Sequence, residues 1–415
     1  MIVRKAFKFR LKPTEEQAFA LRQQGGNARF LYNLLLERHD HHYRVNGKCW
    51  KKNAMIVSIP EIKREHPFLQ ESFSQSLQQV AIQLDRAFVN FFEGRAEHPT
   101  FKSKHDYRDS FTCPQKWRFT SKFVFIPKVG EVRWAMHRQV QGKPKHITVT
   151  QDGDRWFCSV SCEVEIPDIE VKIDDVIGID LGLKDFAVLS DGTRIENPRH
   201  LRKKEVKLRR EQRWLSRKQI GSKNRAKQRA KVRAVHRRVR DARRDFLHKT
   251  TSWLIQSYDG FVLEDLNVRG MVRNHRLAKT ISDVGWGEFG RQLEYKSLWN
   301  GKAFVRIGQF FPSSKLCSDC GAINSELRLS DREWVCAECG CVHDRDLNAS
   351  INIETEGLRM LSCQGSDVAA NTLGHSGIYA RGEGGSGGGV SHRETTLVES
   401  GKVLLASGAK AAGFR

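Results

Sequence analysis

The stretch Val176-Ile177-Gly178-Ile179-Asp180 decides how this chain folds, because a short apolar run that ends in an acid is typical of a buried strand. Residues 186–190 form a second apolar run, and Asp191-Gly192 after it predicts a turn. The two runs therefore predict a hairpin whose first strand carries an aspartate at its end.

Two further acids end regular elements in the same way. Glu264 follows the apolar run 261–263, and Asp346 opens a helix predicted over residues 346–353. Each acid alone has an ordinary alternative: Asp180 could end its strand in a turn, Glu264 could pair with an arginine, and Asp346 could cap its helix. If all three meet at one sheet edge, they can bind two Mg²⁺ or Mn²⁺ ions, hard cations that prefer oxygen ligands and support phosphodiester hydrolysis.

Four cysteines have the spacing of a structural zinc site. The pairs Cys317/Cys320 and Cys336/Cys339 are separated by fifteen residues, and two such thiolate pairs can close a tetrahedron around one Zn²⁺. Gly321 and Gly340, each directly after a second cysteine, suit the turns that this arrangement needs. Cys341 and His343 are close enough to be substitute ligands. With four thiolates the zinc has no open position, so we expect it to hold the shape of the chain.

The net charge indicates a polyanionic partner. Lys and Arg total 71 against 48 acidic residues, which gives +23 at pH 7. Nucleic acid is favoured over an anionic membrane, because no run approaches the ~18 apolar residues of a spanning helix. The start, residues 1–17, lacks the apolar core of a signal peptide, so we expect a soluble protein inside the cell that has no membrane partner.

Much of the positive charge lies between Leu201 and Lys249, which hold 21 Lys or Arg and 4 acidic residues. One glycine and no proline predict a pair of long helices broken near Gly221. A solvated coiled coil is the alternative, but solvated helices usually mix their signs, so we favour a face that follows phosphates. The predicted nucleic-acid contacts here are Arg202, Lys203, Lys204, Arg209, Arg210, Arg213, Lys223, Arg225, Lys227, Arg229, Lys231, Arg233, Arg237 and Arg238.

The remaining segments differ in their hydrophobic pattern and composition. Residues 3–11 alternate basic and apolar residues as a half-buried strand does, and a helix should follow from Glu15. Apolar spacings of three and four up to Phe92 predict packed helices, whereas residues 100–170 hold short β-rich runs that the first strand should join. The Gly-, Ser- and Ala-rich residues 361–415 are expected to be disordered.

Taken in order, these motifs resemble a known family. Gly178-Ile-Asp-Leu-Gly182, Val262-Leu-Glu-Asp-Leu266 and residues 343–353 (HDRDLNASINI), with the cysteine unit just before the last, resemble the RuvC-like nuclease domain of TnpB proteins. TnpB proteins are related to the compact type V CRISPR effectors and to Fanzor proteins. The likeness also includes residues 26–30, 245–249 and 282–289. It therefore covers roughly residues 1 to 355.

The resemblance implies an α/β RNase H-like (RuvC) nuclease domain with an inserted zinc unit, beside a helical recognition domain and a small β-barrel-like wedge domain. It implies the catalytic, metal-binding roles for Asp180, Glu264 and Asp346; Asp344 is the alternative to Asp346, which lies two residues before Asn348 as the family pattern requires. The expected divisions are 1–13 (first wedge strand), 14–100 (helical), 101–172 (wedge), 173–310 and 344–360 (nuclease), 311–343 (zinc) and 361–415 (tail).

The resemblance also implies the partners: a guide RNA from the transposon end, and DNA that is cut next to a short target-adjacent motif, in double-stranded and single-stranded form. Sequence is then read mainly by base pairing. Gln78, or its neighbour Gln79, could read an adenine, although exposed glutamines are usually only solvated. The zinc unit could guide single-stranded DNA or be purely structural. The family implies a prokaryotic cytoplasmic protein that associates with the nucleoid when bound to DNA.

Two other functions remain open from the sequence. The chain could be an RNA-guided or direct DNA-binding regulator that does not cut. It could also be a transposase that joins strands with the same carboxylate chemistry. Neither the oligomeric state nor the target-adjacent motif follows from the sequence.

Overall fold

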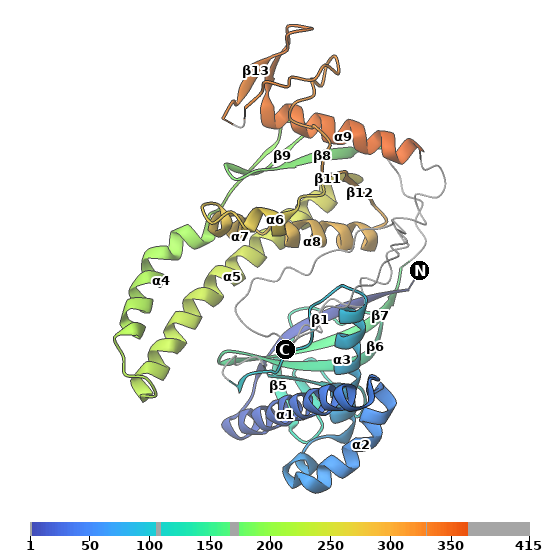
Figure 1. Cartoon of the computed structure of the whole chain (residues 1–415), viewed down its shortest axis with the longest axis vertical. Helices are drawn as coiled ribbons and strands as arrows, with labels where there is room; N and C mark the ends of the chain where they lie inside the picture. The colour runs from blue at the N-terminus through green and yellow to red at the C-terminus, as the bar shows by residue number, and fades with distance from the viewer. Residues whose placement is uncertain (1, 105–108, 167–173, 329, 364–415) are drawn as a thin grey trace.

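The computed structural model describes residues 2–104, 109–166, 174–328 and 330–363, and Figure 1 shows its arrangement. Two main sheets are present in this part of the chain, a seven-stranded sheet near the N-terminal helices and a five-stranded sheet under the last helix. A third sheet of two short strands, β13 (Glu333–Val335) and β14 (Val342–Asp344), lies in the cysteine-rich segment.

The seven-stranded sheet is antiparallel throughout, in the order β2-β6-β7-β1-β5-β4-β3. The prediction for residues 3–11 is confirmed: β1 lies between β7 and β5, with Phe7 opposite Val160. Phe7, Phe9 and Leu11 are buried while Arg10 and Lys12 are exposed, as a half-buried strand requires. Its strands are β1 (Ile2–Lys12), β2 (Ser110–Cys113), β3 (Arg118–Phe119), β4 (Phe123–Ile126), β5 (Gly130–Ala135), β6 (Lys143–Asp152) and β7 (Arg155–Glu165).

Helices α1 (Glu15–Asn46) and α3 (Ser74–Phe92) pack on this sheet. Helix α2 (Lys52–Glu65) packs on α3 and on a short 3₁₀ turn at Pro67–Glu71. The helix predicted from Glu15 starts there because Thr14 caps it in a capping box with Gln17, and it ends at Gly47 in the left-handed conformation. Leu35 and Leu84 of the helices belong to the same core cluster as Val149 of the sheet. The helical and β-rich segments therefore share one hydrophobic core.

The five-stranded sheet has the order β10-β9-β8-β11-β12. Strands β8 and β9 form the predicted antiparallel hairpin, whereas β11 lies parallel to both β8 and β12. This mixed order agrees with the expected RNase H-like sheet. The strands are β8 (Val176–Leu181), β9 (Asp185–Leu189), β10 (Arg194–Glu196), β11 (Gly260–Glu264) and β12 (Ala303–Ile307).

Helices cover both faces of this sheet. The remaining helices are α4 (His200–Ser216), α5 (Lys223–Ser257), α6 (Val268–Val272), α7 (Ala278–Val284), α8 (Trp286–Trp299) and α9 (Arg345–Cys363). Ile177 and Ile179 of β8 share a cluster with residues of α5 and α8, whereas Val176 and Val262 share one with Ile353 of α9. Because side chains alternate along a strand, every second residue of β8 and β11 faces α9.

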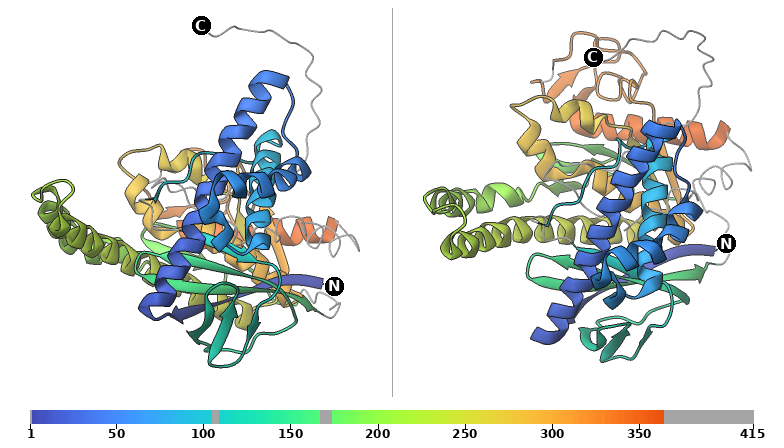
Figure 2. Two further views of the ribbon diagram at one scale, coloured as in Figure 1. Left: turned by 90° about the horizontal axis from the view of Figure 1, so that it is seen from below. Right: turned by 60° about the horizontal axis from the view of Figure 1, so that its bottom comes forward.

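The two long cationic helices are confirmed, and they extend away from the sheets as a hairpin (Figure 2). Their turn contains Gly221 with a φ of +84°. Arg225 holds the turn, because its Nη1 donates hydrogen bonds to the carbonyl oxygens of Leu215 (2.9 Å) and Lys218 (2.8 Å). Leu208, Val232 and Val235 form the small apolar seam between the helices.

The predicted start of the tail at residue 361 is too early. Helix α9 runs to Cys363, because Leu361 is buried and extends the apolar side of the helix. The rest of the predicted tail, 364–415, lies outside the described residues. None of the described helices combines the length and apolar character that crossing a membrane would require.

Two glycines allow α9 to lie directly on the sheet. A Cβ at Gly178 would be 2.0 Å from the carbonyl oxygen of Ser350 and 2.6 Å from the amide nitrogen of Glu354. A Cβ at Gly357 would be 2.3 Å from Cγ2 of Val262. The helix therefore sits closer to β8 and β11 than any side chain at these positions would permit.

We predict that Gly178→Ala destabilises the protein, because the added methyl group must push α9 off the strand. The free energy of unfolding should fall by about 3 kcal/mol, which thermal denaturation would detect. Gly308→Ala is the control, since a Cβ there meets no atom within 4 Å. Equal melting temperatures for the two variants would contradict the close packing of α9.

Candidate functional site

The structure brings Asp180, Glu264 and Asp346 to the same end of the sheet. Leu263 of β11 lies opposite Ile179 of β8, so the following residues of these parallel strands, Glu264 and Asp180, are neighbours. Alternation turns both toward α9, and Asp346 lies in the first turn of that helix. Burial, and then the charges of Glu264 and Asp346, raise the pKa of Asp180 to about 7.

Neighbouring polar groups hold Glu264 in place. Burial raises the pKa of the Glu264 carboxyl, while the Ser313 hydroxyl donates a hydrogen bond to Oε1 and opposes that rise. Ser313 is itself fixed by Asn352 of α9, whose Nδ2 donates to the Ser313 carbonyl oxygen at 2.8 Å. The sequence reasoning missed Ser313, because nothing in the local pattern around it indicates a contact with a strand 49 residues away.

Two arginines neutralise Asp346. Nη1 of Arg332 is 2.9 Å from one carboxylate oxygen, and Nη2 of Arg345 is 3.0 Å from the other. Arg332 comes from the cysteine-rich segment, so this ion pair connects that segment to the acids. Both arginines were missed from the sequence, although Arg345 is the direct neighbour of Asp346.

Asp344 has a different role from Asp346. One of its carboxylate oxygens accepts a hydrogen bond from the backbone amide of Leu347 at 2.9 Å, which caps α9, and pairs with Nη2 of Arg194, also at 2.9 Å. These contacts hold the pKa of Asp344 below its ordinary value despite the opposing effect of burial. Asp344 is therefore occupied as a helix cap, while Asp346 faces the other two acids.

The three acids offer oxygen ligands of the kind that Mg²⁺ or Mn²⁺ prefers. Burial first, and then the negative charges of Glu264 and Asp346, raise the pKa of Asp180, and a bound divalent cation would oppose both effects. The carboxylates are nevertheless not drawn together as tightly as a formed metal cluster. Within the described ranges, groups of three or more ligand atoms that all lie within 4.8 Å of one another occur only around the cysteines.

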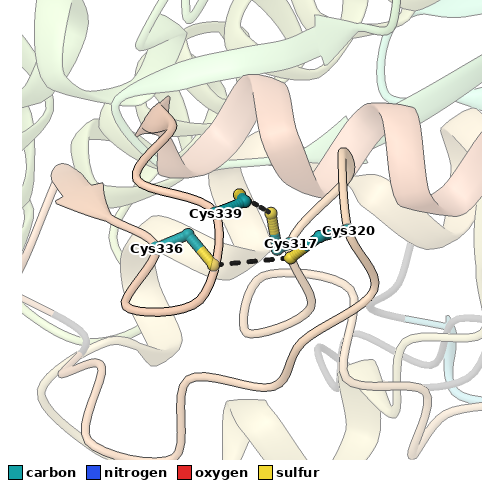
Figure 3. A group of neighbouring side chains, drawn as sticks. All are labelled: Cys317, Cys320, Cys336 and Cys339. Atoms are coloured by element: carbon teal, nitrogen blue, oxygen red, sulfur yellow. Dashed lines mark hydrogen bonds between the residues drawn. The ribbon is translucent and has the colours of Figure 1, made fainter.

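The four predicted cysteines converge from two loops (Figure 3). The Sγ atoms of Cys317 and Cys339 are 3.7 Å apart, and those of Cys320 and Cys336 are 3.6 Å apart. Such a cluster is compatible with one tetrahedral zinc ion.

The predicted glycine turns of this cluster are confirmed. Gly321 and Gly340 have φ values of +76° and +74°, which a residue with a Cβ rarely adopts. Of the two substitute ligands, His343 lies with its Nε2 3.0 Å from Sγ of Cys317 and forms a second group with Cys317 and Asp319. Cys341 belongs to neither group.

Asparagines of α9 fasten this cluster to the acids. Nδ2 of Asn348 donates to the carbonyl oxygen of Leu316 at 2.7 Å, and its Oδ1 accepts from the amide of Ser318 at 2.9 Å. Asn352 donates to the same Leu316 oxygen at 2.6 Å. The strand that enters the cysteine loop is thus held against the helix that carries Asp346.

Most of the predicted nucleic-acid contacts are exposed on the α4–α5 hairpin. Arg225 is half-buried, and its guanidinium holds the turn of the hairpin. Arg237 is also half-buried and pairs with Asp154 in the turn between β6 and β7. Arg233 is half-buried, and Gln78 is exposed on α3. The exposed members are Arg202, Lys203, Lys204, Arg209, Arg210, Arg213, Lys223, Lys227, Arg229, Lys231 and Arg238.

Three family models match the chain. They are described as a "Helix-turn-helix domain" (residues 1–48), a "Probable transposase" (159–275) and a "Cas12f1-like, TNB domain" (286–353). The described residues of the first stretch form one strand and one long helix in this structure, and so not a helix-turn-helix.

Similar chains extend over almost the whole sequence. The chain is 39% identical over 370 residues to a "Putative RNA-guided DNA endonuclease" of Streptomyces pristinaespiralis, covering 87% of this chain and 91% of that protein. It is 35% identical to the "Putative RNA-guided DNA endonuclease InsQ" of Escherichia coli (strain K12), covering 86% and 93%. In fold it is similar to the protein in a "Cas12f1-sgRNA-target DNA complex", with a TM-score of 0.54 at 14% identity, covering 85% of this chain and 99% of that one.

The fold is thus that of the RuvC-containing Cas12f group. Within that class, the chain belongs to the TnpB family, also called the IS605 OrfB family.

We predict that Asp180→Asn stabilises the protein against heat near pH 8 in buffer without added divalent metal. The folded pKa of about 7 lies above that of the unfolded chain, so the stability associated with protonated Asp180 is lost as the pH rises through that value. The gain in melting temperature should shrink toward about pH 5. Asp245→Asn, on an exposed part of α5, is the control; a gain that is the same at every pH would contradict the raised pKa.

Proposed function

We propose that this protein is an RNA-guided DNA endonuclease of an insertion-sequence transposon, which uses a guide RNA from the transposon end to cut DNA next to a short target-adjacent motif. The observation that carries the proposal is the placement of Asp180 and Glu264 at the ends of two parallel strands, beside the helix whose first turn contains Asp346. The names of the similar proteins in Streptomyces pristinaespiralis and Escherichia coli support the same activity.

In this proposal Asp180, Glu264 and Asp346 hold divalent cations, Mg²⁺ or Mn²⁺. When bound, these ions supply an activated water and charge neutralisation at the leaving oxygen of the phosphodiester. Ser313 orients the Glu264 carboxylate, and Arg332 and Arg345 position that of Asp346. We also propose that the chain divides into the wedge, helical, nuclease and zinc parts that the sequence predicts.

Nucleic acid would be held mainly through its phosphates. The exposed cations of the α4–α5 hairpin suit a backbone-following role, with sequence read by the guide and Gln78 near the target-adjacent motif. The zinc cluster would hold the segment that carries Arg332, and so keep Arg332 beside Asp346.

The decisive test compares Asp180→Asn with Asp344→Asn. Loss of a metal ligand should reduce Mg²⁺-dependent cleavage of a guide-matched DNA by about a thousandfold or more, since metal ions stabilise the transition state by several kcal/mol. Binding of RNA and DNA should persist. Asp344→Asn should still cut, because asparagine also caps a helix well.

The products of this experiment also separate the alternatives. Cleavage that survives Asp180→Asn would overturn the assigned site, and a wild-type protein that binds guide and target without cutting would be the regulator instead. Strand-joined products with a donor end would favour a transposase, the activity that the matched "Probable transposase" description suggests.

Zinc is tested separately from cleavage. The purified protein should contain about one Zn²⁺ per chain by atomic absorption, and Cys336→Ser should lose it and melt at a lower temperature. Cys341→Ser is the control, because Cys341 lies outside the four-sulfur group. Retention of zinc by Cys336→Ser together with its loss in Cys341→Ser would show that the ligand set is wrong.

A further inference from the structure

A cationic pocket lies outside the acid site. It has a volume of about 480 Å³ and forms where the turn between β1 and α1 meets the turn between β6 and β7. Four basic side chains from three segments line it: Arg10 and Lys12 at the end of β1, Arg22 on α1, and Arg155 at the start of β7. We call this the Arg22 pocket.

No ion pair in the described part of the protein neutralises these four cations, although Arg155 lies near enough to Asp154 to lower the pKa of that carboxyl. Among the described residues, none of them forms an ion pair within 4.0 Å, unlike Arg237 and Arg240 of the neighbouring α5. The Nε atom of Arg155 is buried and has no hydrogen-bond acceptor. Like charges that converge without counter-charges repel one another, and a buried unpaired donor costs free energy, so this arrangement favours a bound anion.

The acids near the pocket do not neutralise it. Two line it, Glu15 and Asp154, but Asp154 is already paired with Arg237 of α5. Glu15 is exposed in the first turn of α1 and makes no ion pair in the described part of the chain. The lining therefore retains an excess of positive charge that water alone must screen.

The pocket is connected to the cationic hairpin. Asp152 and Asp154, on either side of Gly153, pair with Arg240 and Arg237 of α5; the Asp152 pair has an Nη2 to Oδ2 distance of 2.6 Å. These ion pairs fix the β6–β7 turn, and with it Arg155, beside the helix. The exposed cations of α5 therefore lie on the same helix that holds the β6–β7 turn and Arg155 in place.

We propose that the Arg22 pocket binds a phosphodiester of a nucleic-acid strand whose neighbouring phosphates lie along the α4–α5 hairpin. This inference rests on the proposed function, since it assumes that the chain binds RNA and DNA. Arginine suits the role because its planar guanidinium can donate two parallel hydrogen bonds to one phosphate. RNA and DNA carry the same group, so the experiment must separate them.

The test uses the full-length protein with Arg22→Gln and Arg155→Gln. Fluorescence anisotropy would measure the affinity for the RNA that copurifies with the protein and, separately, for duplex DNA, between about 0.05 and 0.2 M salt. Arg22→Gln should weaken binding of one nucleic acid by about tenfold and reduce the slope of log affinity against log salt by about one. Arg22→Lys should recover part of the loss, because it keeps the charge.

Lys122→Gln is the matched control, an exposed lysine in the turn between β3 and β4 and outside the pocket. A selective loss for RNA, or for DNA, supports the inference and identifies the strand that is bound. An unchanged salt slope in Arg22→Gln, or an equal loss in Lys122→Gln, overturns it. If circular dichroism shows that Arg155→Gln does not fold, the result for Arg22→Gln alone tests the inference, because Arg22 is exposed.

The outcome also separates this inference from the proposed function. If the wild-type protein cuts guided DNA and Arg22→Gln binds and cuts equally well, only the inferred role of the Arg22 pocket is contradicted. If the wild-type protein binds neither RNA nor DNA, both the pocket inference and the proposed function are contradicted.

Discussion

The close approach of α9 to β8 and β11 is the contact on which the acid site depends. Gly178 and Gly357 leave room for the helix backbone to lie against the strands, with the first turn of α9 near the ends of both. Strand alternation then determines which side chains face that turn. Asp180 and Glu264 face it because Val176, four residues before Asp180, and Val262, two residues before Glu264, pack under the same helix.

The acid site and the cysteine cluster are parts of one assembly. Asn348 and Asn352 bind the loop that leads into the cysteines, Ser313 reaches Glu264, and Arg332 returns from between the cysteine pairs to Asp346. Each contact joins segments that are separated in the sequence but adjacent in space. A zinc ion that orders the loops would therefore also order the surroundings of the acids, although its own coordination shell is filled by sulfur.

The sequence predicted those features that have a local pattern. Apolar runs that end in acids, the two cysteine pairs, the broken cationic helices and the first strand all follow from spacing and alternation within a few residues. It could not predict Arg332, Ser313 or the Asp154–Arg237 pair, because an ion pair between distant segments leaves no periodic signal. The Arg22 pocket was missed for the same reason, since its cations come from three separate segments.

The position of α9 in the chain has a consequence for protein synthesis. The ribosome makes the β-rich unit, the cationic hairpin and two of the acids before it reaches Asp346, so the third acid is among the last described parts to emerge. A nascent or prematurely terminated polypeptide would contain the cationic hairpin without the complete set of three carboxylates. In the proposed activity, such products would lack one of the three carboxylates that hold the divalent cations.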